Sequence, residues 1–190
     1  MTEAVPTLAP PIPVKIIVAG GFAVGKTTFV AAVSEIEPLS TEAPLTQMSR
    51  GVDDHGRRST KTATTVAMDF GRITLGADLV LYLFGTPGQG RFQFMWDDLV
   101  RGAIGAVVLV DSERLAESFA AVDYFERLGM AFVVAVNTFD GIAAHHLADV
   151  RDALALGPGV PLSYCDARDR PSAHQTLIAL VQHAVALATA

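Results

Sequence analysis

Short, uninterrupted apolar runs alternate with longer amphipathic stretches along most of this chain. The runs Val14–Ala19, Ala103–Val110 and Met130–Val136 lack the polar alternation of a half-exposed strand, so they predict strands covered on both faces. Between such runs, apolar residues recur at helical spacing, as in Lys26–Glu37, where Pro38 ends the pattern. Strands that alternate with helices predict a parallel sheet with right-handed crossovers.

The remaining pattern completes a three-layer α/β/α fold. Two apolar-rich runs joined at Gly76-Ala77 predict one antiparallel hairpin. The polar stretch Leu39–Lys61 has no regular period, so we expect a loop, and a loop of this length is usually functional. The other expected elements are helices at Arg91–Arg101, Leu115–Leu128, His145–Leu156 and Pro171–Ala188, and strands at Thr62–Leu75, Asp78–Phe84 and Val160–Tyr164. We therefore expect a mostly parallel, six-stranded sheet with one antiparallel edge hairpin.

Composition favours a single domain behind a short tail. Residues 1–13 contain four prolines and read as a flexible extended tail, and residues 14–190 then form one domain. Hydrophobic residues make up 51% of the 190 residues, which excludes a disordered chain. The net charge of −6 argues against binding to nucleic acid or to an anionic membrane surface. The single cysteine and the lack of a signal peptide, a spanning segment or a lipidation motif favour a cytoplasmic protein without a membrane anchor.

A phosphate-binding motif lies between the first predicted strand and the first predicted helix. Residues Gly20–Thr27 fit G-x-x-x-x-G-K-[ST], which places the predicted fold among P-loop NTPases. The glycines let backbone N–H groups close around a phosphate, and the helix N-terminus adds a positive dipole. A plain glycine turn would not explain Lys26, which is expected to reach the β- and γ-phosphates, or Thr27, whose hydroxyl can ligate Mg²⁺. The candidate nucleotide-binding residues here are Gly20, Gly21, Phe22, Ala23, Val24, Gly25, Lys26, Thr27 and Thr28.

A second motif, Asn137-Thr138-Phe139-Asp140, follows a buried strand, at the sheet edge where ligands bind in this architecture. The Asp140 carboxylate can accept hydrogen bonds from N1–H and the N2 amine of guanine, whereas adenine offers neither donor there. The Asn137 amide can reach O6 or N7 and brace the loop. An Asn-x-x-Asp loop cap is the alternative explanation of this short motif.

With Thr65, Thr86–Gln89 and Cys165–Arg168, these motifs resemble a Ras-like small GTPase from Val14 onward. The runs Thr-Thr-Val-Ala-Met-Asp-Phe-Gly and Phe-Gly-Thr-Pro-Gly-Gln are similar to bacterial members, relatives of the MglA polarity switch of the kind encoded in actinobacterial conservon operons. The resemblance implies that the protein binds GTP or GDP with Mg²⁺ and hydrolyses GTP slowly. It also implies regulatory and effector partners, among them a Roadblock-type regulator and a sensor-kinase-like protein.

The resemblance also implies roles for single residues. Thr65 is similar to the switch I threonine that meets Mg²⁺ and the γ-phosphate, and Leu39–Thr64 would then be switch I. Gly88 resembles the switch II glycine whose N–H meets the γ-phosphate, and Gln89 resembles the glutamine that orients the attacking water. The implied catalytic residues are Gln89, Lys26 and Thr65, and the implied metal ligands are Thr27 and Thr65. The implied base-binding residues are Asn137, Thr138, Asp140, Cys165, Asp166 and Ala167, with the Ala167 N–H on guanine O6.

The sequence departs from the family's pattern at several positions. Gly85 stands where an aspartate usually holds Mg²⁺ through a water, so either Asp69 or Asp111 compensates or magnesium is held more weakly. Thr138 replaces a lysine whose stem packs over the base. No arginine directly precedes Thr65. The nearby candidates for an arginine acting on the γ-phosphate are Arg50, Arg57 and Arg58.

Apolar residues gather just after Gln89, at Phe92, Phe94, Met95, Trp96 and Leu99. They form either the buried face of a short helix or an apolar patch that reads out the switch to an effector. Two other function classes stay open. One is an ATP-dependent phosphotransferase on the same phosphate loop, although no arginine-rich lid follows. The other is a nucleotide-holding scaffold with little hydrolysis, which the loss of the aspartate at Gly85 suggests.

Overall fold

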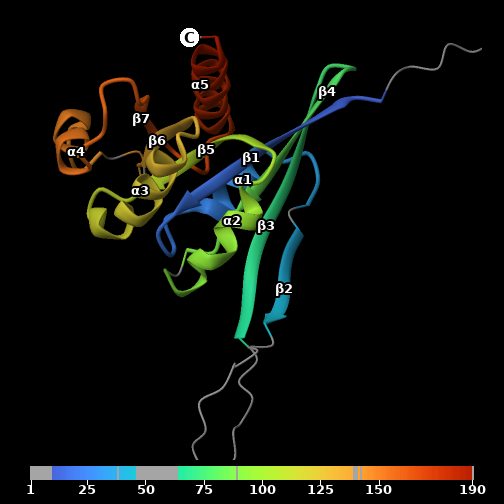
Figure 1. Cartoon of the computed structure of the whole chain (residues 1–190), viewed down its shortest axis with the longest axis horizontal. Helices are drawn as coiled ribbons and strands as arrows, with labels where there is room; N and C mark the ends of the chain where they lie inside the picture. Colours follow the sequence, from blue (N-terminus) through green and yellow to red (C-terminus); the bar gives the residue numbers. More distant parts are fainter. Residues whose placement is uncertain are drawn as a thin grey trace, which may run out of the picture.

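A seven-stranded sheet in the order β2-β3-β4-β1-β5-β6-β7 forms the centre of the molecule (Figure 1). The computed structural model describes residues 10–37, 39–45, 64–88, 90–138, 141 and 143–189. The strands are β1 (Ile12–Gly20), β2 (Leu39–Leu45), β3 (Thr64–Leu75), β4 (Leu79–Gly85), β5 (Ala103–Val110), β6 (Phe132–Asn137) and β7 (Leu162–Cys165). The helices are α1 (Lys26–Val33), α2 (Trp96–Leu99), α3 (Phe119–Leu128), α4 (Leu147–Ala153) and α5 (Arg170–Ala188), with short 3₁₀ helices η1 (Gly90–Met95) and η2 (Leu115–Glu117).

Helices pack on both faces of this sheet. Alternate residues of β1 point to opposite sides: Ile16 and Val18 join the core under α1 and α5, whereas Ile17 and Ala19 join the core under α2, α3 and α4. Every residue of β6 is buried, which is why its sequence is an unbroken apolar run. The three-layer α/β/α fold that we expected is confirmed. In the described ranges, no helix combines the length and the apolar character needed to cross a bilayer.

Strand directions follow the prediction in the centre of the sheet. Strand β1 runs parallel to β4 and β5, and β6 runs parallel to β5 and β7. Strands β3 and β4 form the expected antiparallel hairpin. Strand β1 begins at Ile12, two residues before the expected start. The N–H of Ile12 donates to the Asp78 carbonyl oxygen.

The edge strand β2 corrects one expectation. Residues Leu39–Leu45 pair antiparallel with β3, in a register from Leu39 opposite Phe70 to Leu45 opposite Thr64, where we expected a loop. The segment is polar and contains Pro44, which lacks a backbone N–H, and such a residue is tolerated at a sheet edge. Residues 46–63, the rest of the expected switch I loop, lie outside the described residues.

Helix α1 ends at Val33, before the expected stop at Pro38. The Ser34 hydroxyl accepts hydrogen bonds from the N–H groups of Ile36 and Arg72, both at 3.2 Å. The N–H of Glu35 donates to the Arg72 carbonyl at 2.8 Å. The chain after Val33 is therefore bonded to β3 instead of continuing the helix, as short hydroxyl side chains often cause.

Candidate functional site

The phosphate loop connects β1, at the centre of the sheet, to α1. At Gly20 a Cβ atom would collide with the Leu109 carbonyl oxygen, and φ is 139°. Ala23 and Gly25 also have positive φ, at 56° and 105°. Alternation between right- and left-handed residues makes a concave backbone whose N–H groups converge, and such a nest binds anions.

Lys26 is held at this loop by the backbone. Its Nζ donates to the carbonyl oxygens of Gly20 at 3.0 Å and Gly21 at 2.6 Å, and the residue is buried. Burial lowers the pKa of its ammonium group to about 8, although Asp69 and Glu117 favour the charged form. The ammonium group therefore lies in a poorly solvated place, where anionic oxygens would be favourable partners.

Gly88 approaches the same loop from the chain that follows β4. A Cβ atom on Gly88 would lie 2.6 Å from Lys26 Nζ and 2.7 Å from the Gly21 carbonyl oxygen. A side chain at this position would therefore force the two segments apart. The structure thus brings the residue expected to meet a γ-phosphate next to the phosphate loop.

These segments enclose a cavity of about 330 Å³. The lining contains both polar and apolar groups, and one of its members, Phe22, has 60% of its surface exposed. The lining residues are Phe22, Ala23, Gly25, Lys26, Thr27, Thr28, Asp69, Thr86 and Gly88. Six of the nine predicted phosphate-loop residues thus line one hollow, and Gly20, Gly21 and Val24 are not among its lining residues.

Among the described residues, Asp69 is the one whose carboxylate lines this cavity. The Thr27 hydroxyl donates to Asp69 Oδ2 at 2.7 Å, and Asp69 is buried on β3. A Cβ atom on Gly85 would lie 3.0 Å from Asp69 Oδ2, so the Asp69 side chain occupies the space beside the glycine. A hydroxyl and a carboxylate oxygen are donors that suit Mg²⁺, which is usually held by one or two carboxylates together with phosphate oxygens and water.

Asp111, the other candidate, has different partners. Its carboxylate accepts a 2.8 Å hydrogen bond from Arg114 Nε and a 3.0 Å hydrogen bond from the N–H of Glu113. Arg114 also lies 3.5 Å from Glu117, so Asp111, Arg114 and Glu117 form a small network of charges at η2. Of the two candidate carboxylates, Asp69 lines the cavity beside Thr27 and Asp111 is not among the lining residues, while the role of either in holding magnesium stays a prediction.

Asn137 braces the loops predicted to bind a base. Its Nδ2 donates to the Val24 carbonyl oxygen at 2.9 Å, and its Oδ1 accepts from the Ala167 N–H at 3.1 Å. A Cβ atom on Gly25 would lie 2.7 Å from Asn137 Nδ2, which explains this glycine. The buried Thr138 donates its N–H to the Cys165 carbonyl oxygen at 2.9 Å. The Asn137 side chain therefore ties the phosphate loop to the loop that contains Ala167.

Contacts within the protein organise the last loop. The Ala167 N–H, which we expected on guanine O6, is engaged by Asn137. The Cys165 side chain packs in the core under α5, and burial raises the pKa of its thiol. The Asp166 carboxylate pairs with Arg168 at 3.0 Å, and this contact lowers its pKa. The loop is thus organised by its own hydrogen bonds, which sequence spacing does not reveal.

Several expected site residues cannot be placed. Gln89, Asp140, Arg50, Arg57 and Arg58 lie outside the described residues. The backbone of Thr65 lies in β3 opposite Pro44, but its side chain is also outside the described part. The proposed roles of these residues stay predictions.

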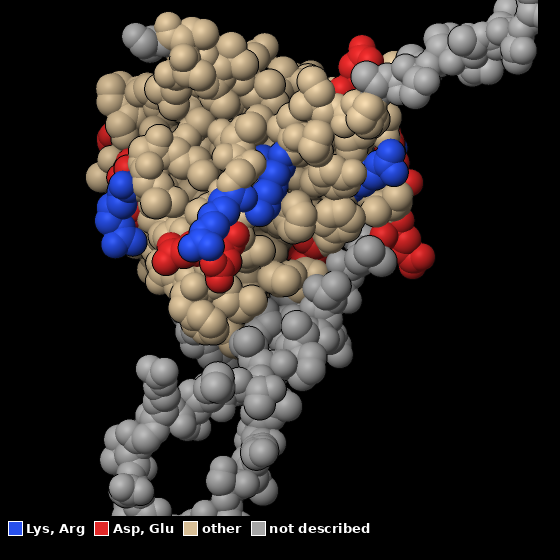
Figure 2. All heavy atoms as spheres, turned by 45° about the vertical axis from the view of Figure 1, so that its right-hand side comes forward, with Lys and Arg blue, Asp and Glu red and all other residues tan. Residues whose placement is uncertain are grey.

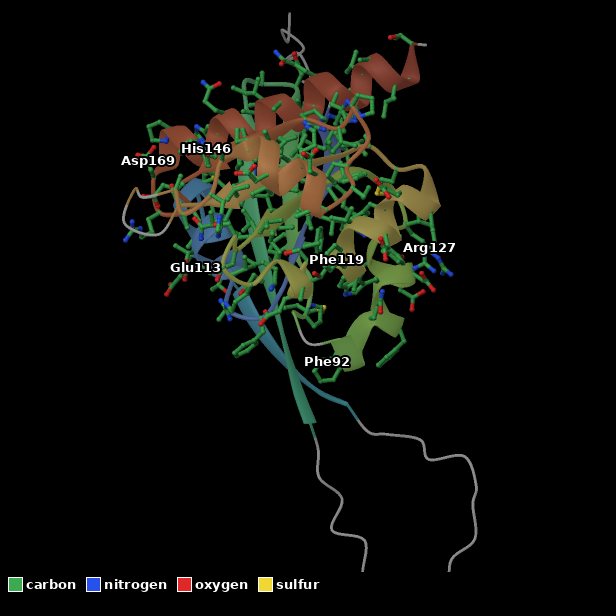
Figure 3. All side chains as sticks on the ribbon, turned by 90° about the vertical axis from the view of Figure 1, so that its left-hand side faces the viewer. Phe92, Glu113, Phe119, Arg127, His146 and Asp169 are labelled. Atoms are coloured by element: carbon green, nitrogen blue, oxygen red, sulfur yellow. The ribbon has the colours of Figure 1, made fainter. Side chains whose placement is uncertain are left out.

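The apolar cluster after residue 89 divides into two parts. Phe92 and Trp96 are buried, as expected for the inner face of a short helix, whereas Phe94 is 65% exposed, and its contact with an effector stays a prediction. Trp96 packs edge-on against Tyr124 of α3 with ring centroids 5.2 Å apart, and the Tyr124 hydroxyl donates to Asp97 at 2.7 Å. In Figure 3 the segment that carries Phe92 lies below α3, whose ends are marked by Phe119 and Arg127.

The described surface carries both signs of charge. In Figure 2 the Lys and Arg side chains on the visible face lie beside Asp and Glu side chains. Arg101 and Asp98 are one such exposed pair, 3.2 Å apart. On the described part of this face, basic side chains do not gather into a patch.

Comparison with known proteins identifies the family. Residues 18–187 match a family described as "Conserved hypothetical ATP binding protein". The chain belongs to this family. It is also 34% identical over 101 residues to the uncharacterized protein MJ1339 of Methanocaldococcus jannaschii. That alignment covers 53% of this chain and 53% of the relative, so the chain matches about half of the relative's length.

Solved structures share the fold of this chain. The cytosolic domain of the T. maritima FeoB iron transporter in a GDP form superposes with a TM-score of 0.65 at 18% identity, covering 93% of this chain and 65% of that one. The FeoB G-domain from Methanococcus jannaschii superposes with a TM-score of 0.59 at 14% identity, covering 90% of this chain and 97% of that domain. This chain thus spans slightly less than two thirds of the FeoB cytosolic domain but nearly all of the G-domain.

Proposed function

We propose that this protein is a guanine-nucleotide switch that binds GTP or GDP with Mg²⁺ and hydrolyses GTP slowly. One observation carries the proposal: a single cavity brings together the Lys26 ammonium, the Thr27–Asp69 pair and the Gly88 backbone. These are the groups needed to neutralise phosphates, hold a hard cation and contact a terminal phosphate. The resemblance to bacterial Ras-like GTPases of the MglA type supports the same function.

Lys26 and the loop backbone would hold the phosphates. In the structure the Lys26 ammonium is bonded to two carbonyl oxygens, and phosphate oxygens would replace these neutral partners with charged ones. Thr27 and Asp69 would hold Mg²⁺, which supplies charge neutralisation between the β- and γ-phosphates. Thr65 lies just after residues 46–63, and we propose it as a further Mg²⁺ ligand when GTP is bound.

Hydrolysis would depend on Gln89 to orient the attacking water and on Gly88 to contact the γ-phosphate. We expect GTP hydrolysis by the protein alone at a rate on the order of 10⁻⁴ to 10⁻² s⁻¹ if no arginine acts on the γ-phosphate. An arginine finger contributes about 10³–10⁵ to the rate. Such a switch acts by binding a partner protein. The exposed Phe94 beside α3 could contact an effector or a regulator. A Roadblock-type regulator and a sensor-kinase-like protein are the partners that we propose.

The choice of base is the part of the proposal that most needs a test. The family description names ATP, and the Ala167 N–H is engaged within the protein. Guanine recognition therefore rests on the Asp140 carboxylate, which would accept hydrogen bonds from N1–H and the N2 amine of guanine. Nucleotide extracted from the purified protein and identified by chromatography should be GDP or GTP. Equal competition by ATP and GTP for a fluorescent GDP analogue would overturn the guanine assignment.

Two variants sharpen this test. Asp140→Asn should weaken GTP and favour xanthosine triphosphate, which presents an acceptor where guanine presents a donor. Gln89→Leu should abolish single-turnover phosphate release while GTP affinity stays nearly unchanged, and Gln93→Leu is the matched control. Wild-type protein that binds GTP without any hydrolysis would be the nucleotide-holding scaffold, and protein that retains only ATP would favour the phosphotransferase.

A further inference from the structure

We infer that the hydroxyl of Thr86 is a positioning group of this site, which hydrogen-bonds to an oxygen around the bound Mg²⁺. The inference rests on the proposed function and adds a residue to it. The oxygen belongs either to a metal-bound water, which would donate a hydrogen bond to the hydroxyl, or to the γ-phosphate, which would accept one from it. Neither the phosphate-loop pattern nor the resemblance gives this side chain a role.

The first observation is that the Thr86 hydroxyl is buried without a partner. The residue is 2% exposed, and its Oγ1 makes no hydrogen bond in the described part of the chain. Its backbone is held in place, because its N–H donates to the Val18 carbonyl oxygen at 2.9 Å. Buried hydroxyl groups are nearly always paired, so an unpaired one needs an explanation.

The second observation is the direction of the cavity. Thr86 lines the same hollow as Lys26, Thr27, Asp69 and Gly88. Among the described residues, four buried side-chain atoms lack a partner, and Thr86 Oγ1 is the one whose residue lines this hollow. The unpaired group thus belongs to the part of the molecule that the proposed ligand would fill.

The position of Thr86 explains why a hydroxyl is useful there. Gly85 ends β4 without a carboxylate, and Asp69 reaches in from the neighbouring strand β3 to meet Thr27. Thr86 follows Gly85 directly and enters from the end of β4. A hydroxyl can donate to a phosphate or water oxygen and can also accept from a water. Asp69 and Thr86 together would then hold Mg²⁺ and the oxygens around it, as a single carboxylate at position 85 usually does.

This inference predicts opposite effects in free and loaded protein. Thr86→Val keeps the shape and removes the hydroxyl. In nucleotide-free protein no bond is lost, so the thermal midpoint should stay equal or rise. In loaded protein one hydrogen bond is lost, so the half-saturating Mg²⁺ concentration for nucleotide binding should rise about five- to tenfold. Thr86→Ser should restore the wild-type value, and Thr86→Ala is a second hydroxyl-free variant in case the valine does not fold.

Thr176→Val is the matched control. Thr176 is also a buried threonine, but its hydroxyl donates to the Ser172 carbonyl oxygen at 3.2 Å within α5. This variant should lower the thermal midpoint of the free protein and leave the Mg²⁺ requirement unchanged. The experiment uses the full chain, stripped of nucleotide with EDTA, and titrates Mg²⁺ with either a fluorescent GDP analogue or a fluorescent GMPPNP analogue.

The outcomes separate the inference from the proposed function. A raised Mg²⁺ requirement with both nucleotides supports a metal-bound water as the partner, and a rise with GMPPNP alone supports the γ-phosphate. If Thr86→Val destabilises the free protein as Thr176→Val does, or leaves both titrations unchanged, the inference is wrong while the proposed function stands. Wild-type protein that binds neither nucleotide overturns the proposed function as well.

Discussion

The Thr27 hydroxyl donates a 2.7 Å hydrogen bond to Asp69 Oδ2, across 42 residues of the chain. Thr27 lies in the first turn of α1, and Asp69 lies on β3, next to the bare backbone of Gly85. The contact shows how a carboxylate can be supplied from a neighbouring strand when the expected position holds glycine. The proposed Mg²⁺ site can therefore be tested directly at these residues.

Asp69→Asn should raise the Mg²⁺ requirement of nucleotide binding. The amide can still accept the Thr27 proton, but it lacks the negative charge that attracts a cation. Loss of a group that supports a metal site typically costs about 10- to 100-fold in metal affinity. Binding of a fluorescent GDP analogue against Mg²⁺ concentration measures the shift. Asp111→Asn removes a carboxylate bonded to Arg114 and should leave the curve in place; a shift with both variants would contradict the assignment.

Gly85→Asp should destabilise the protein. Its Cβ would lie 3.0 Å from Asp69 Oδ2, so two carboxylates would share one place and repel each other. We expect a loss of about 1–3 kcal/mol, visible in thermal denaturation near neutral pH and smaller in acid. The double variant Gly85→Asp, Asp69→Ala carries one carboxylate and should recover most of the loss. No recovery would mean that backbone strain, and not charge, is the cause.

Nucleotide affinity should fall in alkaline solution because of Lys26. Burial lowers the pKa of its ammonium group to about 8 in the free protein. Phosphates favour the charged form, so binding above this pH must take up a proton. Affinity for GDP should be level up to about pH 7.5 and then fall by up to tenfold per pH unit. Lys15→Met should keep this profile and Lys26→Met should flatten it; a level wild-type profile to pH 9.5 would contradict the lowered pKa.

The lowered pKa of Lys26 also affects the stability of the nucleotide-free protein, which should rise with pH where nucleotide affinity falls. A lysine in the unfolded chain has a pKa of about 10.4, so between about pH 8 and 10.4 the unfolded state binds more protons than the free folded state. The penalty of the buried charge is present in full below pH 8 and disappears as pH rises. Through this residue, the free energy of unfolding of nucleotide-free protein should increase over that window. Lys26→Met should lack the increase in a denaturant series.

Tyr124→Phe should loosen the segment after residue 89. The tyrosine hydroxyl donates to Asp97 at 2.7 Å, and burial together with this carboxylate raises the pKa of the phenol. A hydrogen bond to a charged group contributes about 1.5–3 kcal/mol. Amide exchange should accelerate across η1 and α2. Tyr164→Phe, whose hydroxyl meets the exposed His145 carbonyl at 2.8 Å, is the control and should change little.

Much of the fold is predictable because the central strands carry an unambiguous signal. Ala103–Val110 was predicted with the bounds that β5 has in the structure, since an unbroken apolar run between turns leaves few alternatives. The phosphate loop was found because its chemistry requires residues at fixed spacing. Strand β2 was missed because its polar sequence with Pro44 has no period. The early end of α1 depends on Ser34 and its bond to Arg72, which no local pattern reveals.

The site is less predictable where partners are distant in sequence. The choice between Asp69 and Asp111 depends on which carboxylate faces Thr27, and this follows from the pairing of β3 with β4. The use of the Ala167 N–H by Asn137 likewise needs the loops to be assembled. The unpaired Thr86 hydroxyl has no sequence signature, because burial and missing partners are properties of the folded chain.

The Asn137 brace has a consequence for how the protein is made. It joins Val24, near the start of the chain, to Ala167, near its end. A ribosome releases the phosphate loop first, and domains fold only as their sequence emerges. The loop therefore stays unbraced until β6 and the segment after β7 have been synthesised. We therefore expect a nucleotide to stabilise nascent chains that extend past Ala167 more than shorter ones.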